Sequence, residues 1–441
     1  MFMTVLLMVV YQTLQFALLP FLVPILFILN AKRAIFGNIA QRMGFVPKTN
    51  RKHNVVWIHA VSVGEVFSVE QLITRIKEKQ PDTVCYLTVG TTGGMKMAHN
   101  AIAADYISFL PYDFGPFMLL AYLRIKPSSI IIVEAELWPN FLSIGKLTSI
   151  PMFWLNARIN PRSARRISTF KFIFKILINC FQTILAQSND DKNSFIKLGV
   201  SPQKITVLGN LKTFNVIAKK NNYLATVLTD NHESYCIPTL FAGSIHPQED
   251  CIYFELFKKL KPQFPTLKLI LAPRHFSWGE QLQTNAQKTN FPFFIWNETS
   301  SIFSQSTQSY TQALTSIFKN HDIVLVCKLG ELFPLYRYAT IYYLGGTMIP
   351  HGGHNLLEPA AWQIPTIIGP YHHNSTDIVR QLEHCNGIIK VQSNTDLYEK
   401  TKELLANPTL RTNIGNASYT WVNKEARLVQ KTLDNLISRI T

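Results

Sequence analysis

Carboxylates follow two predicted strands at positions where α/β sheets bind ligands. Glu65 begins a helix after a strand and a glycine turn, in the motif Trp57-Ile-His-Ala-Val-Ser-Val-Gly-Glu65. Glu134 and Glu136 follow another buried strand, in Glu134-Ala-Glu-Leu-Trp-Pro-Asn140. A carboxylate at this edge can take the proton of a bound hydroxyl as a general base. The same residues also fit structural roles, in which Glu65 complements a helix dipole and Glu134 or Glu136 holds loop amides or an arginine.

A glycine-rich segment in the second half predicts a loop that binds phosphate and ribose: Gly345-Gly-Thr-Met-Ile-Pro-His-Gly-Gly-His-Asn-Leu-Leu-Glu-Pro-Ala360. Its glycines let the backbone approach a ligand, and a helix beginning near Asn355 would offer amides to a phosphate. Glu358, one turn later, would accept hydrogen bonds from ribose hydroxyls. His351 and His354 have no third metal ligand at a suitable spacing, so hydrogen-bonding roles are favoured over metal binding.

Other polar segments lie at or just beyond predicted strand ends. In the second half they are Ala242-Gly-Ser-Ile-His246, Ala272-Pro-Arg-His275 and Leu329-Gly-Glu331. In the first half, Thr88-Val-Gly-Thr-Thr-Gly-Gly94 offers hydroxyls and amides as anion-binding turns do, although it matches no P-loop. A dense basic run fits either a solvated helix face or the phosphates of a lipid: Arg158, Arg162, Arg165, Arg166, Lys171 and Lys175.

The elements that would position these residues are parallel strands with crossover helices. From Val55 onward, short runs rich in β-branched and aromatic residues alternate with longer helical patterns. The first set of expected strands is Val55–His59, Val84–Val89, Ile130–Val133, Met152–Leu155, Thr183–Ala186 and Ile205–Leu208. The second set is Leu240–Ala242, Leu267–Leu271, Ile323–Val326, Ile341–Leu344, Thr366–Ile368 and Ile388–Lys390.

The two sets of strands predict two Rossmann-like α/β domains with parallel sheets that face each other across a cleft. We expect the N-terminal domain over residues 32–212 and an interdomain linker over 213–238, which is polar and has no strong period. The C-terminal domain is expected over residues 239–441. Its last helical stretch, Leu397–Ile440, is expected to pack back on the first domain. A Ser-, Thr- and Gln-rich stretch, Glu298–Thr315, is expected as a surface loop.

The first 31 residues carry no charged side chain and predict an N-terminal membrane anchor helix. The apolar stretch Met1–Leu29 is long enough to cross ~30 Å of hydrocarbon. Lys32 and Arg33 follow it, which argues against a cleaved signal peptide and places the remaining chain on the cytoplasmic side. Polar residues and prolines leave an interfacial helix or a half-inserted hairpin open: Gln12, Gln15, Pro20 and Pro24. A buried core helix is less expected, because no polar face appears at helical spacing.

The composition of the 441-residue chain points to a folded protein with anionic partners. Hydrophobic residues make up 47% and charged residues 16%, which excludes a disordered or coiled-coil chain. The net charge of +16 predicts nucleic acid, acidic lipid or a phosphorylated substrate as partner. Nucleic acid is the weakest of these, because the basic run lacks interleaved aromatic residues and no recognition motif is present. The six cysteines form no zinc or disulfide pattern, which favours a reducing compartment.

Taken together, these segments resemble the 3-deoxy-D-manno-octulosonic acid (Kdo) transferases of lipopolysaccharide biosynthesis, in both content and order. The resemblance covers nearly the whole chain. It is carried by the apolar N-terminus, Ser62-Val-Gly-Glu65, Glu136-Leu-Trp-Pro-Asn140, Asn156-Ala-Arg158, Leu211-Lys212, Pro273-Arg-His275, Gly330-Glu-Leu332 and Gly352-Gly-His-Asn-Leu-Leu-Glu358.

The resemblance implies a GT-B glycosyltransferase that moves Kdo from CMP-Kdo to a lipid A precursor (lipid IVA), with inversion and at the cytoplasmic face of the inner membrane. It implies no metal or other cofactor. Glu65 would be the general base, and Glu134 or Glu136 would support the transition state together with Lys212. The implied CMP contacts are Pro273, Arg274, Leu329, Gly330, Glu331, Asn355, Leu356, Leu357 and Glu358.

Two segments depart from the family pattern. Asn210-Leu-Lys212 is followed by Thr213-Phe-Asn215, where the family has Phe-Asp after its Ser-Leu-Lys, so an acidic partner of Lys212 is missing or displaced. Cys327-Lys-Leu precedes Gly330 where the family more often has Asp-Thr-Met. The alternatives are a membrane-associated GT-B transferase that uses a UDP-sugar, and a catalytically silent, bilobed binding protein.

Overall fold

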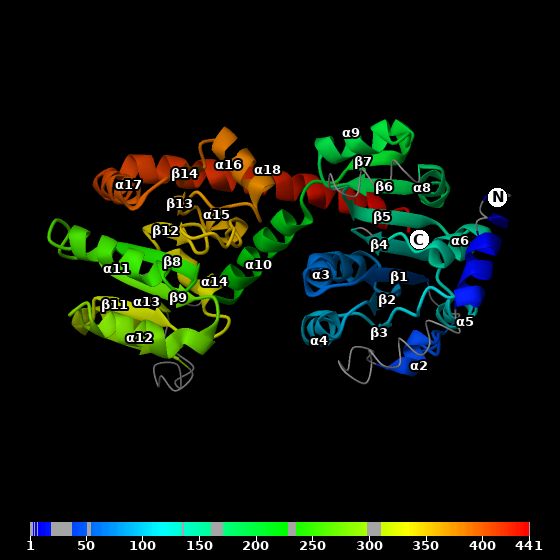
Figure 1. Cartoon of the computed structure of the whole chain (residues 1–441), viewed down its shortest axis with the longest axis horizontal. Coiled ribbons are helices and arrows are strands. Elements are labelled where there is room, and N and C mark those ends of the chain that lie inside the picture. The colour runs from blue at the N-terminus through cyan, green and yellow to red at the C-terminus, as the bar shows by residue number, and fades with distance from the viewer. Residues whose placement is uncertain are drawn as a thin grey trace. The chain divides into compact units, whose positions relative to one another are not determined.

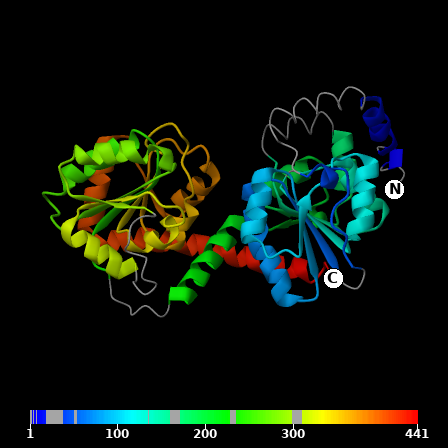
Figure 2. The ribbon, with the colours of Figure 1, turned by 90° about the horizontal axis from the view of Figure 1, so that it is seen from below.

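A computed structural model describes residues 3, 5–6, 8–18, 38–50, 54–134, 136–159, 171–227, 235–297 and 310–440. The chain divides into two compact units. Unit 1 comprises Met1–Asn215 together with Glu425–Thr441, and unit 2 comprises Val216–Lys424. Each unit is a parallel seven-stranded sheet with helices on both faces (Figures 1 and 2).

The sheet of unit 1 has the strand order β3-β2-β1-β4-β5-β6-β7, so the order in which the chain adds strands reverses between β1 and β4, while all strands stay parallel. Its strands are β1 (Val55–Ala60), β2 (Val84–Val89), β3 (Tyr106–Phe109), β4 (Ser129–Val133), β5 (Met152–Ala157), β6 (Thr183–Ala186) and β7 (Ile205–Val207). The helices are α2 (Ile39–Arg42), α3 (Val63–Lys79), α4 (Thr92–Ala101), α5 (Gly115–Ile125), α6 (Pro139–Leu147), α8 (Lys171–Ile178) and α9 (Asn189–Lys197), with a 3₁₀ turn at η1 (Pro202–Lys204).

The sheet of unit 2 has the order β10-β11-β9-β8-β12-β13-β14 and reverses between β8 and β12. Its strands are β8 (Thr239–Ile245), β9 (Lys268–Pro273), β10 (Phe293–Trp296), β11 (Ile323–Val326), β12 (Ile341–Leu344), β13 (Thr366–Ile368) and β14 (Ile388–Lys390). The helices are α11 (Glu249–Leu260), α12 (Gly279–Gln287), α13 (Tyr310–Asn320), α14 (Leu332–Leu335), α15 (Leu357–Ala361), α16 (Thr376–His384) and α17 (Asn394–Ala406), with 3₁₀ turns at η2 (Phe276–Trp278) and η4 (Tyr336–Tyr338).

The twelve strands expected from the apolar runs are all present, which confirms the α/β class. The two strands that were missed, β3 and β10, lie at the edges of the two sheets. The first residues of both strands are only partly buried, and this weakens the apolar signal on which the prediction depends. The expected loop ending at Thr315 is wrong in its last part, because helix α13 begins at Tyr310 and buries Ala313 and Leu314. Residues 298–309 lie outside the described part of the chain.

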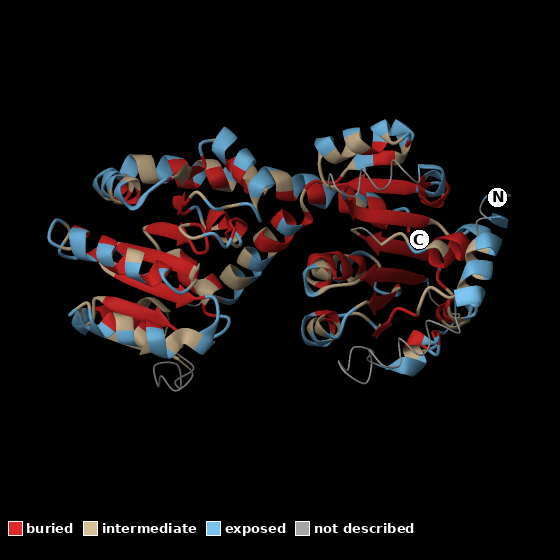
Figure 3. Ribbon diagram, viewed as in Figure 1, coloured by how far each residue is buried: buried red, intermediate tan, exposed pale blue. Residues whose placement is uncertain are grey.

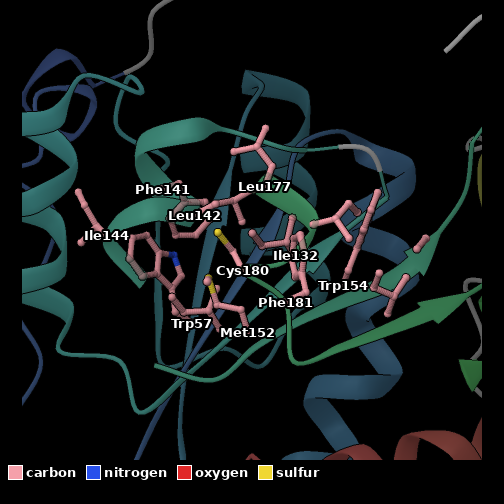
Figure 4. Close-up of a cluster of buried hydrophobic side chains, with 14 of the residues drawn as sticks. Trp57, Ile132, Phe141, Leu142, Ile144, Met152, Trp154, Leu177, Cys180 and Phe181 are labelled. Carbon is pink, nitrogen blue, oxygen red and sulfur yellow. The ribbon is translucent and has the colours of Figure 1, made fainter. Parts of the chain in front are cut away.

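The core of unit 1 packs aromatic side chains against the sheet (Figure 4). Trp154 on β5 is 1% exposed, stacks on Phe181 with ring centroids 5.3 Å apart and meets the edge of Phe195 at 5.2 Å. Trp57 on β1 packs on Phe141 of α6 at 4.6 Å. Figure 3 shows both sheets buried and the outer faces of the helices exposed. The strands that carry the acidic loops are therefore rigidly held.

The N-terminal helix, described over residues 8–18, packs on unit 1 through polar side chains. The Gln12 amide donates to Asn140 Oδ1 at 2.6 Å, and the Gln15 amide donates to the carbonyl of Asp113 at 2.6 Å. Asn140 is fully buried, and its amide donates back to the oxygen of Gln15 at 3.1 Å. The two glutamines that interrupt the apolar stretch thus bind the domain.

The anchor helix predicted over residues 1–31 is not supported. Among the residues that the structure describes, no helix combines the length and the apolar character needed to span a membrane. Residues 1, 2, 4, 7 and 19–31 of the predicted anchor lie outside the described residues. The structure differs from the prediction because Gln12 and Gln15 form hydrogen bonds that hold the first helical segment against the rest of unit 1.

Two long helices each contribute residues to both units. α10 (Leu211–Val227) occupies most of the stretch expected as a polar linker, and its residue Val216 packs in the core of unit 2. α18 (Pro408–Ile437) follows α17 after a break at Pro408, and residues from Glu425 onward cluster with unit 1. There Arg75 donates to both oxygens of Asp434, at 2.5 and 2.8 Å. In each helix, apolar residues at helical spacing pack against the units. The low average hydropathy of the segment does not indicate this packing.

Candidate active site

The three predicted carboxylates lie at the carboxyl ends of β1 and β4, the neighbouring strands between which the sheet of unit 1 reverses. Glu65 stands in the first turn of α3 directly after β1. Glu134 and Glu136 follow β4. The carboxyl groups are close enough to influence one another electrostatically, since Glu65 is affected by Glu134 and Glu136 by both. This reversal point is where open α/β sheets bind ligands.

Glu65 is half-buried and caps its own helix. Its Oε2 accepts from the backbone N–H of Val61 at 2.8 Å, and its Oε1 accepts from the hydroxyl of Ser62 at 2.9 Å. Ser62 is the N-cap residue of α3, and its hydroxyl accepts from the Glu65 N–H at 3.4 Å. This reciprocal capping box fixes the carboxylate on the strand end. The structural and the functional interpretations of Glu65 are therefore compatible.

Glu134 sits in a strained loop that the core of unit 1 holds in place. Its φ is +57°, a left-handed conformation that is unfavourable for a residue with a side chain. The indole of Trp154 donates to the carbonyl of Glu134, and the Asn156 amide approaches its Oε1 at 3.4 Å. Glu136 accepts from the indole of Trp138 at 2.5 Å. Sequence reasoning assigned no role at the site to Trp154, because a buried aromatic residue in a strand is read as core.

Burial and nearby negative charges both raise the carboxyl pKa values of Glu65 and Glu136. Burial is the main cause of the raised pKa of Glu65, the charge of Glu134 adds to the rise, and the hydrogen bonds from Val61 and Ser62 oppose it. The pKa of Glu136 is also raised, mainly by burial and further by Glu65 and Glu134. A carboxylate with a raised pKa is a stronger base toward a substrate hydroxyl.

Replacing Glu134 by Gln is expected to move the acid limb of the pH–rate profile to lower pH. Removing one negative charge lessens the repulsion that favours the protonated form of Glu65, so Glu65 ionises at lower pH. The measurement is kcat/KM across pH 4–9 for the variant and the wild type. This range begins near the ordinary pKa of a glutamate side chain, which is ~4. An acid limb that stays in place or moves to higher pH would contradict this electrostatic coupling.

In unit 2 the predicted CMP contacts are spread over three loops. Pro273 ends β9 and is buried, whereas Arg274 is exposed and its N–H donates to the carbonyl of Ile245 at 2.9 Å. The next loop carries Leu329, which is 83% exposed, and Gly330, which has a φ of +87° that favours glycine. Glu331 is 7% exposed because Tyr310 and Lys328 bind its carboxylate, at 2.6 and 3.0 Å. Glu331 thus holds its loop.

The third loop differs in detail from the prediction. Helix α15 is five residues long and begins at Leu357, two residues later than expected, and Asn355 Oδ1 accepts from the Leu357 N–H at 3.0 Å. Leu356 and Leu357 are buried in the core of unit 2. Glu358 accepts from Lys219 Nζ at 3.2 Å. Lys219 on α10 was read as part of the linker, and only the fold shows that it pairs with Glu358.

The glycine-rich backbone is bound largely by a residue that sequence reasoning missed. Glu249, fully buried in the first turn of α11, accepts from the N–H groups of His246, Gly346 and Met348 at 3.0, 2.7 and 3.2 Å. Those amides are therefore occupied by protein. His354, which was expected in a hydrogen-bonding role, approaches His246 with 2.8 Å between their Nε2 atoms. Among the described residues, no group of three or more His, Cys, Asp or Glu side chains is arranged to hold a metal.

Lys212 stands in the first turn of α10 with an exposed side chain, and its N–H donates to Asn210 Oδ1 at 3.1 Å. Asn215, which replaces the acidic residue of the family pattern, is buried and donates to the carbonyl of Phe67 on α3 at 2.7 Å. The amide therefore joins α10 to α3 in unit 1. Of the predicted basic run, residues 160–170 lie outside the part of the chain that is described.

Two doubly wound α/β units, each with its polar residues at the reversal of its sheet, define a GT-B-like glycosyltransferase fold. Residues 37–215 match the family model of 3-deoxy-D-manno-octulosonic-acid transferase, or kdotransferase. A Kdo transferase of Haemophilus influenzae is 29% identical over 406 residues, which cover 90% of either chain. One of Aquifex aeolicus is 29% identical over 82% of this chain and 90% of its own. The chain is therefore a homologue of the Kdo transferases, which are glycosyltransferases of lipopolysaccharide biosynthesis.

Among solved structures, UDP-GlcNAc 2-epimerase of Neisseria meningitidis has the same fold. It aligns with a TM-score of 0.56 over 86% of this chain and 100% of its own, at 12% identity. This likeness concerns the fold alone.

Proposed function

We propose that this protein is an inverting transferase that moves Kdo from CMP-Kdo to a lipid A precursor (lipid IVA) at the cytoplasmic face of the inner membrane. The homology to Kdo transferases supports the reaction class. The observation that carries the proposal is the Glu65 carboxylate, fixed at the end of β1 beside Glu134 and Glu136.

In the proposed reaction, Glu65 accepts the proton of the acceptor hydroxyl as that oxygen attacks the anomeric carbon of Kdo. Attack from the face opposite the leaving CMP inverts the configuration. Glu134 or Glu136, together with the exposed Lys212, supports the charges that develop. The raised pKa of Glu65 suits this role, because proton transfer is most effective when the pKa of the base approaches the working pH.

In the same proposal, unit 2 binds the nucleotide of the donor. Arg274 is exposed beside the glycine-rich loop and can pair with the phosphate of CMP. The carboxylate of Glu358, held by Lys219, can accept hydrogen bonds from ribose hydroxyls. Leu329 and Gly330 form the exposed tip of a loop beside the buried Glu331. This tip could pack against the cytosine base of the nucleotide. The reaction needs no metal in this scheme, because cationic side chains meet the leaving phosphate.

Apolar side chains on one side of unit 1 support a location at the membrane surface. Leu119 and Leu123 of α5 are 48% and 60% exposed, and Leu14 of the N-terminal helix is 55% exposed. These elements adjoin, since Phe16 meets Phe114 at 5.0 Å beside the start of α5. Exposed apolar groups on adjoining elements are typical of proteins that lie on a bilayer.

Changing both Leu119 and Leu123 to Gln is expected to weaken binding to vesicles about tenfold, because each leucine loses part of the ~1.5–3 kcal/mol gained by burying its side chain in hydrocarbon. Co-sedimentation with anionic phospholipid vesicles measures this. The matched control changes the similarly exposed Ile196 and Leu428 to Gln, on α9 and α18. Equal losses in both double variants would argue against a membrane-facing role for α5.

The decisive test of the function is product analysis. Purified protein is incubated with CMP-Kdo and a tetra-acylated lipid A precursor, and the products are analysed by mass spectrometry. We expect a gain of one or more Kdo units. Product formed only from a UDP-sugar would identify a different donor, and binding of CMP without any product would indicate a silent binding protein.

A further inference from the structure

Four histidines and an arginine from three loops gather at the reversal point of the second sheet. His246 follows β8, Arg274 and His275 follow β9, and His351 and His354 follow β12. His246 stacks on His351 with centroids 4.1 Å apart and an interplanar angle of 9°, and His275 lies 6.4 Å from His246. In the sequence these five residues lie in three separate segments, and only the fold brings them together.

The short contact between His246 and His354 requires a proton on one of the two facing ring nitrogens. Their Nε2 atoms lie 2.8 Å apart, within hydrogen-bond distance. Two nitrogen lone pairs at that separation would repel, so one of the two rings must carry its proton on Nε2. Gly346 lies beneath the pair, and a Cβ there would meet His246, His351 and His354 at 3.4 Å. The loop therefore holds the rings together in a fixed arrangement.

The protein surroundings favour the neutral form of the pair. Burial lowers the pKa of His354 to about 4 and also lowers that of His246, and Arg274, His275 and His351 act in the same direction.

The groups whose charges act on His246 and His354 are all basic. Glu249 on α11 uses both carboxylate oxygens for backbone amides. His373, after β13, lies against Gly352 and adds a further basic group. The described part of this cluster thus joins basic groups with one fully engaged carboxylate.

We propose that the His246–His354 pair is a proton-coupled phosphate site, which takes up a proton when the monoester phosphate of a nucleotide binds beside Arg274. The proposal rests on the proposed nucleotide donor and deepens it. A bound dianion compensates the repulsion among the basic groups, so the pair changes from two neutral imidazoles, with one ring proton each, to one imidazole and one imidazolium, with three ring protons in all. The added proton comes from solvent, and no covalent bond changes.

The physical consequence is a preference for the product nucleotide. In CMP-Kdo the phosphate is a diester with one negative charge, and in released CMP it is a monoester with nearly two above pH ~6. A site that gains a proton with the second charge stabilises the leaving group as the bond to the sugar breaks. His246 and His354 would thus contribute to the rate as well as to nucleotide affinity.

Calorimetry with CMP on the full chain at pH 7.5 tests the proposal. CMP is titrated in buffers of different ionisation enthalpy, and the slope of the observed enthalpy gives the protons taken up. CMP itself is almost fully ionised at this pH, with a second phosphate pKa of ~6. We expect uptake of about half to one proton per CMP in the wild type, because a bound dianion is expected to raise the pKa of the pair toward neutrality. His354→Gln and His246→Gln are expected to remove most of it, whereas the exposed His384→Gln, on α16, leaves it unchanged.

The outcomes separate this inference from the function on which it rests. If CMP binds with the same enthalpy in every buffer, the pair takes up no proton and the inference is wrong, while CMP binding still stands. Uptake that persists in both pair variants would likewise overturn it. If CMP gives no binding in the wild type, the proposed donor itself is wrong. Absence of proton uptake in the wild type is by itself enough to overturn the inference, even if a variant does not fold.

Discussion

Replacing Glu65 by Gln is expected to lower kcat for Kdo transfer about 10³-fold, within the range of 10²–10⁴ attributed to general base catalysis. Glutamine keeps the size of the side chain and can still accept from the Val61 N–H, but it cannot take a proton. Radiolabelled or mass-resolved product formation at saturating donor and acceptor measures the loss. Binding of CMP to unit 2 is expected to remain.

The matched control is Glu78→Gln, an exposed residue near the end of the same helix α3. This substitution also removes one negative charge, but Glu78 lies far along the helix from the reversal point of the sheet, so full activity is expected. The wild type should lose activity as pH falls through the pKa of Glu65, which burial raises above its ordinary range, because the protonated carboxyl cannot act as base. Equal amounts of product from Glu65→Gln and from the wild type would contradict the role of Glu65 as the general base.

Replacing Trp154 by Ala is expected to lower the free energy of unfolding by about 3–5 kcal/mol, the cost typical of removing a large buried aromatic side chain. Trp154 is 1% exposed and packs against Phe181 and Phe195. Urea unfolding followed by circular dichroism measures the loss. A loss below about 1 kcal/mol would mean that the surrounding core collapses into the space, contrary to its dense aromatic packing.

Trp154→Phe separates packing from positioning at the same residue. Phenylalanine retains most of the buried ring but removes the indole donor to the carbonyl of Glu134. A smaller loss of stability, about 1–2 kcal/mol, is expected from the unpaired carbonyl. kcat is expected to fall even at temperatures where the variant is fully folded. The reason is that the strained loop of Glu134 loses the hydrogen bond from the indole. Unchanged kcat and KM would show that Trp154 serves only the core.

The strand prediction succeeded where burial on both sheet faces makes a continuous apolar run. Ile130–Val133 on β4 is wholly buried and was placed correctly. Tyr106–Phe109 at a sheet edge was missed, since its first two residues are only partly buried and alternate with polar neighbours. The stretch from Thr213 was read as a linker because its Lys and Asn residues lower the average hydropathy, although Val216 and Tyr223 at helical spacing pack in unit 2.

The acidic residues of the site were predictable for a local reason. Glu65, Glu134 and Glu136 each follow a recognisable strand, and parallel strands bring their carboxyl ends to one edge. Their neighbours in space were not predictable in this way. The pairing of Glu358 with Lys219 joins residues 139 positions apart, and the contact of His246 with His354 joins residues 108 apart. No local pattern encodes such distances.

The amino-acid sequence alone determined the α/β class and the order of motifs along the chain, because both depend on short-range periodicity and residue type. The tertiary structure decided which strands neighbour each other, and so brought the loops after β1 and β4 to one edge and those after β8 and β12 to another. It also decided that Gln12 and Gln15 bind unit 1. Burial, pKa shifts and the shared proton of two histidines all depend on what surrounds a group in space, which is set by the packing of distant segments.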